Sequence, residues 1–153
     1  MRTASLVAIT TGALALLGGC TSVGSTHSEA EATASAPVKV VYHVNEGNAQ
    51  ALNALRNINN HLTADPTAKI VVVAHAAGIN FLLDGAKDSN GAPFEPTVQQ
   101  LKDKGVEFRV CRFTLTRNNI DPKKVLEEAS LVPSGVAEIS RLQAKEGFAY
   151  LRP

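Results

Sequence analysis

The chain has 153 residues, a length that suits one domain folded around one core. Hydrophobic residues make up 44% of it, which is ordinary for a globular protein, and aromatic residues are few. The formal net charge is only +1, so the charge balance gives no electrostatic reason to expect binding to nucleic acid.

The first 19 residues are typical of a secretory signal peptide. Arg2 precedes a small and apolar run over residues 4–17, which is too short to span a membrane. The run ends in Leu17-Gly18-Gly19-Cys20 and resembles the lipobox of bacterial lipoproteins. This resemblance implies cleavage before Cys20, a lipid on its sulfur and a place in the periplasm, with Thr21 favouring the outer membrane. An ordinary signal peptide cleaved nearby, or an uncleaved anchor, is the alternative.

Residues 20–37 contain mostly Ser, Thr, Ala and Glu, with almost no large apolar side chain. Such a stretch cannot bury enough surface to offset its ordering entropy, so we expect a flexible tether between lipid and domain. If Cys20 carries a lipid, Cys111 is the remaining cysteine, which indicates a free reactive thiol or an intermolecular partner. A disulfide between Cys20 and Cys111 is possible only without the lipid.

From residue 38 onward, patterns of strands alternate with patterns of helices. Residues 38–44 and 69–75 are nearly continuous β-branched runs, typical of buried strands in parallel sheets. Between them, apolar residues at helical spacing predict a helix over about 47–63. A short helix over about 79–86 and a helix over 95–103 are predicted next.

The second half of the chain continues this alternation. A strand is predicted over 105–111, whereas residues 112–119 show no clear pattern. A short helix follows, opened by Asp121 and Pro122. A brief strand at 131–132, a helix ended by Gly147 and a last strand at 148–151 complete the series. We therefore predict an α/β fold with a five-stranded, mostly parallel sheet and helices on both faces.

The strand over 105–111 delivers Cys111 to its own carboxyl end. Arg109 and Cys111 share one face of this strand, and Arg112 follows directly. A nearby guanidinium favours the thiolate, which is the nucleophilic form of cysteine. The alternative is a buried cysteine that only fills space, since free cysteine is among the most buried residue types.

His43, His75 and Cys111 all stand at or near strand ends, where parallel strands meet at one edge of the sheet. Their convergence would suit a thiol activated by an imidazole. Asn45 and Gly78, in the turns after the first two strands, would complete the pocket. The separations of 32 and 36 residues match no local metal motif, so we predict no metal site.

Several other catalytic signatures are absent from the sequence. It contains no phosphate-binding glycine-rich loop, no Gly-x-Ser-x-Gly elbow and no Cys-x-x-Cys pair. Hydrolase and dithiol oxidoreductase activities therefore have little support, and no cofactor is predicted.

The segment from Gly105 to Cys111, followed by Thr114 and Leu115, resembles the DsrE/DsrF-like family, in particular its YchN-type branch. Matching segments also occur at 39–44, 57–62, 70–75 and 132–136, so the resemblance covers nearly all of a domain at 38–153. It implies a flavodoxin-like three-layer α/β/α fold and oligomers, often trimers or hexamers.

In the sulfur-relay members of the family, the cysteine after the third strand carries sulfur as a persulfide, and Cys111 falls at that position. The resemblance thus implies a sulfurtransferase-like carrier with protein donors and acceptors of sulfur, its thiolate stabilised by Arg109 or Arg112. Those relay members work in the cytoplasm, whereas we expect this chain to be exported, which argues against tRNA thiolation and reverse sulfite reduction. A non-catalytic, membrane-anchored oligomeric module that binds a small molecule or a protein is the alternative.

Overall fold

The computed structural model describes residues 36–153. In this part of the chain five strands form one sheet in the order β4-β3-β2-β1-β5, and every neighbouring pair is parallel. The predicted five-stranded sheet is confirmed, and it is wholly rather than mostly parallel. The strands are β1 (Lys39–Val44), β2 (Lys69–Ala74), β3 (Glu107–Cys111), β4 (Ala129–Val132) and β5 (Ala149–Leu151).

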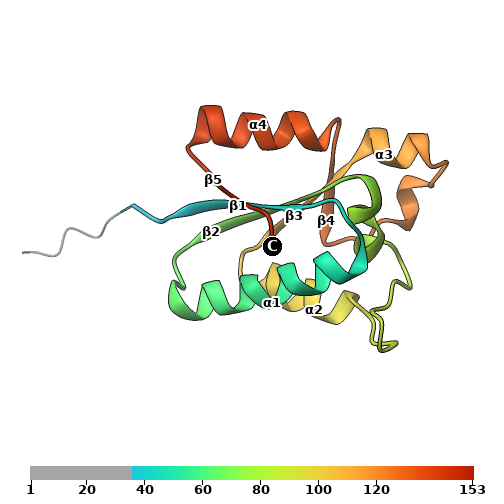
Figure 1. Cartoon of the computed structure of the whole chain (residues 1–153), viewed down its shortest axis with the longest axis horizontal. Helices are drawn as coiled ribbons and strands as arrows, with labels where there is room; N and C mark the ends of the chain where they lie inside the picture. Colours follow the sequence, from blue (N-terminus) through green and yellow to red (C-terminus); the bar gives the residue numbers. More distant parts are fainter. Residues whose placement is uncertain (1–35) are drawn as a thin grey trace, which may run out of the picture. The chain divides into compact units, whose positions relative to one another are not determined.

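Helices cover both faces of the sheet, as Figure 1 shows, which confirms the predicted three-layer α/β/α fold. Helices α1 (Asn48–Ala64) and α2 (Glu95–Asp103) lie on one face. Helices α3 (Arg112–Arg117) and α4 (Gly135–Glu146) lie on the other. Two short 3-10 helices, η1 (Ala76–Leu82) and η2 (Pro122–Lys124), follow β2 and α3.

The two faces bury apolar cores of different size. The core under α1 and α2 is the larger one and contains the bulkiest fully buried side chains, among them Phe81, Phe108, Ile58 and Ile70. The core under α4 is smaller, and its members are Val41, Val71, Val73, Ile139, Leu142 and Phe148. Because side chains alternate across a strand, the central strands contribute to both cores.

Two segments differ from the sequence prediction. The short helix expected at 79–86 is the 3-10 helix η1, which begins at Ala76, directly after β2. Residues 112–117, which showed no clear pattern, form the helix α3. Only Leu115 of this helix is buried, so no apolar periodicity marked it in the sequence.

The predicted signal peptide at residues 1–19, Cys20 and nearly all of the predicted tether lie outside the described residues. Among residues 36–153, no helix combines the length and apolar character needed to cross a membrane.

Candidate functional site

A cavity of about 540 Å³ lies at the carboxyl ends of β2 and β3, next to the start of α4. This is the edge at which open α/β sheets bind their ligands. Three stretches of the chain line it, and the lining residues are His75, Ala76, Ala77, Asn80, Cys111, Phe113, Thr114, Arg117, Asn118, Ser134, Gly135 and Val136.

Cys111 is the last residue of β3, carries a free thiol and directly precedes α3. The residue is only 5% exposed, yet it lines the cavity. Burial raises the pKa of this thiol, but hydrogen bonds from the Thr114 hydroxyl and from the backbone N–H groups of Gly135, Thr114 and Phe113 outweigh burial and lower the pKa overall. The N–H groups of Thr114 and Gly135, in the first turns of α3 and α4, therefore favour the thiolate, while the N–H of Phe113 also donates to the carbonyl of Pro133 at 3.2 Å.

Thr114 connects the thiol to the turn that follows β2. Its Oγ1 accepts a hydrogen bond of 3.1 Å from the backbone N–H of Ala76, which leaves its own O–H to donate to the sulfur of Cys111. Ala76 has a φ of 48°, in the left-handed region that residues other than glycine rarely adopt. Such local strain is common at functional sites, where the surrounding contacts hold it in place.

His75 and Cys111 approach each other across Gly135, the first residue of α4. A Cβ atom added at Gly135 would lie 3.0 Å from the Cβ of His75 and 3.4 Å from the Cβ of Cys111. A Cβ here would be in tight contact with both side chains, so glycine eases the close approach of the start of α4. The contact of Gly135 with both side chains appears only in the fold.

The imidazole of His75 is also joined to His43 on the neighbouring strand β1. Their Nε2 atoms lie 2.7 Å apart, and Nδ1 of His43 lies 2.6 Å from the hydroxyl oxygen of Tyr150 on β5. The centroids of the two imidazole rings lie 4.8 Å apart, with 24° between their planes. The structure thus brings His43 and His75 together, with His75 at the cavity and His43 behind it.

Both imidazoles of this pair favour the neutral form. Burial lowers the pKa of His43 to about 4, with smaller lowering contributions from His75 and Arg152 and an opposing one from Glu46. Burial also lowers the pKa of His75. Both rings are therefore uncharged near neutral pH.

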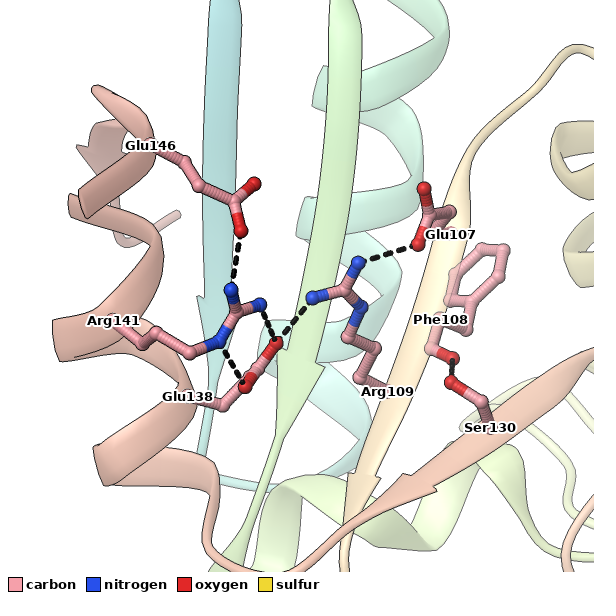
Figure 2. A network of polar contacts seen from close by, with 7 residues as sticks. All are labelled: Glu107, Phe108, Arg109, Ser130, Glu138, Arg141 and Glu146. Carbon is pink, nitrogen blue, oxygen red and sulfur yellow. Dashed lines mark hydrogen bonds and ion pairs between the residues drawn. The ribbon is translucent and has the colours of Figure 1, made fainter.

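Arg109 shares the face of Cys111, but its guanidinium is engaged elsewhere, as Figure 2 shows. It pairs with Glu107 on its own strand at 2.6 Å and with Glu138 on α4, while Arg141 also bonds Glu138. The guanidinium of Arg109 is thus paired with the carboxylates of Glu107 and Glu138, and the pair with Glu138 connects β3 to α4. The groups that lower the pKa of the Cys111 thiol are the hydrogen-bond donors around it, and neither Arg109 nor Arg112 is among them.

Another arginine supplies the cationic side chain at the cavity. Arg112 is exposed and is not among the lining residues, whereas Arg117, at the other end of α3, is one of them. Sequence reasoning missed Arg117 because it did not recognise α3 as a helix. A helical turn brings residues three or four apart to the same side, so Thr114 and Arg117 face the cavity together.

Asn45 and Gly78 are not among the residues that line the cavity at Cys111, contrary to the predicted pocket. A Cβ at Gly78 would lie 2.1 Å from the carbonyl oxygen of Val44, so this glycine permits close packing of η1 on the end of β1. The backbone N–H of Asn45 donates to the buried side chain of Gln50, which in turn donates to the carbonyl of His43. Gln50, absent from the predicted site, thus holds the turn after β1.

The sequence model of the DsrE/DsrF-like family matches residues 38–153. The chain belongs to this family. A protein of unknown function from Methanobacterium thermoautotrophicum, MTH1491, is 32% identical in sequence, and its structure superimposes with a TM-score of 0.67 over 76% of this chain and 99% of the other. The ychN protein of E. coli is 14% identical with a TM-score of 0.63 over the same shares, a likeness of fold alone. No protein of curated function gave a significant match.

Within the described part of this DsrE/DsrF-like chain, no group of three or more His, Cys, Asp or Glu side chains is placed to hold a metal ion. The arrangement at the cavity instead suits a nucleophilic thiol. Hydrogen-bond donors around Cys111 can stabilise a negatively charged sulfur atom. The imidazole of His75 lines the same cavity, which has room for a small sulfur compound beside the thiol.

Proposed function

We propose that this protein is a periplasmic sulfur carrier that holds sulfur as a persulfide on Cys111. The observation that carries the proposal is a free thiol of lowered pKa at the end of β3, inside a cavity and facing several hydrogen-bond donors. Membership of the DsrE/DsrF-like family supports it, because the sulfur-relay members carry sulfur on the cysteine after the third strand.

The proposed transfer conserves atoms and electrons. The Cys111 thiolate attacks the outer sulfur of a donor persulfide, R–S–SH, and forms a new S–S bond. The R–S to S bond breaks, and the thiolate R–S⁻ leaves and takes up a proton. The N–H groups of Phe113, Thr114 and Gly135 and the hydroxyl of Thr114 are placed to stabilise negative charge on sulfur. A second thiol can then attack the outer sulfur and regenerate Cys111.

Mass spectrometry under non-reducing conditions tests this proposal. Full-length protein carrying Cys20→Ser, in which Cys111 is the one remaining thiol, is treated with inorganic polysulfide. We expect the mass of one added sulfur on Cys111, removed again by dithiothreitol and absent in the matched Cys111→Ser protein. Unmodified Cys111 after this treatment would contradict the proposal.

Two exposed apolar side chains at the cavity favour a second candidate function, that of an oligomeric binding module. Phe113 is 66% exposed and Val136 is 58% exposed, and both line the cavity. A partner protein, or a second copy in the trimers or hexamers expected from the family, would bury them. In that case Cys111→Ser would leave binding intact, whereas Phe113→Ser would abolish it.

We further propose that a lipid on Cys20 anchors the protein at the outer membrane. The lipobox pattern before Cys20 supports this location. Cell fractionation should place the native protein with membranes and a Cys20→Ala protein outside them.

A further inference from the structure

The cavity at Cys111 is lined by a positive charge that no lining carboxylate balances. Apart from the thiol itself, Arg117 is the one lining residue of the described chain that is charged at neutral pH, because burial keeps His75 neutral. Arg117 forms no ion pair within residues 36–153. Its guanidinium is therefore available to an anion that enters the cavity.

The first turn of α4 contains an acidic residue, Glu138, but its charge is compensated away from the cavity. The carboxylate pairs with Arg109 and Arg141, and Glu138 is not a lining residue. Residues 134–136, at the start of the same helix, do line the cavity. Because the N-terminus of a helix carries a partial positive charge, it adds to the attraction that Arg117 exerts on an anion.

The depth of the thiol favours a small reaction partner. Cys111 is only 5% exposed, whereas Phe113 and Val136, which line the same cavity, are 66% and 58% exposed. The sulfur therefore lies below these two side chains. A small molecule can enter the cavity and reach the sulfur, whereas a cysteine of a folded protein would have to be inserted on a projecting loop.

The helix α3 places Arg117 close to the thiol. The hydroxyl of Thr114 donates to the sulfur of Cys111, and Thr114 and Arg117 are three residues apart in this helix. Side chains at that spacing lie on the same side of a helix, with Cβ atoms about 5–6 Å apart. Both residues line the cavity, so a molecule of a few heavy atoms can contact the thiol with one end and the guanidinium with the other.

We propose that the sulfur donor for Cys111 is a small anion whose outer sulfur is bonded to an oxyanion group, as in thiosulfate, and that Arg117 binds this oxyanion group. The inference rests on the proposed function, because it names the class of donor that delivers sulfur to the same thiol. A guanidinium presents several N–H donors in one plane and therefore suits the oxygens of an anionic group. Arg117 then holds the leaving group, while the donors around Cys111 stabilise the sulfur that attacks.

The transfer from thiosulfate balances in atoms, electrons and charge. The Cys111 thiolate attacks the outer sulfur of thiosulfate and forms a new S–S bond. The S–S bond within thiosulfate breaks, and its electron pair leaves with sulfite, which takes the place of the leaving thiolate R–S⁻. Cys111 then carries a persulfide anion. The total charge is the same on both sides, and no proton, oxidant or reductant is consumed.

The first test compares alkylation of Cys111 by two reagents of nearly equal size, the anion iodoacetate and the neutral iodoacetamide. Both react with the thiolate, so the ratio of their rates at one pH does not depend on the pKa of the thiol. In full-length protein carrying Cys20→Ser, we expect Arg117→Gln to lower this ratio about three- to fivefold, as for a charge pair that solvent partly screens. Arg117→Lys keeps the charge and should lose less.

Arg112→Gln is the matched control for this test. It removes the same charge from the other end of the same helix, and Arg112 directly follows Cys111 but does not line the cavity. We expect this variant to keep the parent ratio of iodoacetate to iodoacetamide rates. Equal losses in Arg112→Gln and Arg117→Gln, or no loss in Arg117→Gln, would overturn the inference.

The second test treats the same proteins with thiosulfate. We expect one sulfur to be added to Cys111 for each sulfite released, and uptake about tenfold slower in Arg117→Gln than in Arg112→Gln, because a hydrogen bond to a charged group is lost. Sulfate, an oxyanion without a transferable sulfur, should slow uptake at constant ionic strength in the parent but not in Arg117→Gln. No sulfur uptake from thiosulfate, or equal rates in both variants, would overturn the inference.

The two proposals can fail separately in these measurements. Sulfur uptake from polysulfide but none from thiosulfate would leave the carrier function and overturn the anionic donor. A lowered alkylation ratio in Arg117→Gln, without sulfur uptake from either compound, would leave an anion site at Arg117 and overturn the carrier function together with the donor that rests on it.

Discussion

The sheet face under α1 and α2 and the face under α4 are built from alternate residues of the same strands, yet they differ in composition. On β1, Val40, Tyr42 and Val44 join the large core under α1, whereas Val41 and His43 lie on the α4 side. The α4 side also carries Arg109 and Cys111, next to only a small apolar core. One face thus mainly stabilises the fold, while the other can hold polar groups at its carboxyl edge.

Two glycines offer the sharpest way to test this division, one on each side. At Gly78→Ala the new Cβ would meet the backbone of Val44 at 2.1 Å, and a backbone cannot easily move away. We expect a loss of about 3 kcal/mol in the free energy of unfolding, measured with urea. At Gly135→Ala the neighbours are side chains at 3.0–3.4 Å, so we expect a loss of about 1 kcal/mol but a changed alkylation rate at Cys111. Equal losses would contradict the comparison.

Glu138 tests the ion-pair network that fixes α4 to β3. Hydrogen bonds from Arg141 lower the pKa of this carboxyl, burial opposes them, and Arg109 lowers it further. A lowered pKa in the folded state means that the carboxylate stabilises the protein above its unfolded pKa and loses this effect as pH falls through the folded value. Glu138→Gln should therefore cost about 1–2 kcal/mol at neutral pH and progressively less below about pH 4.

Urea unfolding at several pH values checks this prediction, and Glu146→Gln is its matched control. Glu146 also pairs with Arg141, but both side chains are at least 40% exposed. An exposed pair contributes only a few tenths of a kcal/mol, so this variant should change stability little. A pH-independent loss in Glu138→Gln would show that packing, rather than charge, holds the helix.

The last prediction concerns the hydroxyl of Thr114, which accepts from the backbone N–H of Ala76 and donates to the thiol. Thr114→Val removes the hydroxyl that bonds the thiol, so the pKa of Cys111 should rise and alkylation near neutral pH should slow by about three- to tenfold. Thr114→Ser keeps the hydroxyl and should retain the parent rate. If valine and serine behave alike, the donors at the helix ends suffice without the side chain.

Much of the fold follows from local patterns. The β-branched runs that became β1 and β2 and the helical spacing of α1 predict these elements, because a segment buried on both faces leaves a nearly continuous apolar run. The position of Cys111 at the end of β3 also follows from the sequence. Period-two alternation placed Arg109 on the same face, but it does not say which carboxylate that side chain meets.

The partners of the polar side chains depended on tertiary structure. Tyr150 meets His43 across 107 residues because β5 pairs with β1, and that strand order has no local signature. Gly135 lies between His75 and Cys111 because α4 begins at the carboxyl ends of β2 and β3. Periodicity in a sequence reports which face a side chain takes, since that depends on its own strand or helix. Its neighbour across the sheet depends on how distant segments pack, and only the folded chain decides that.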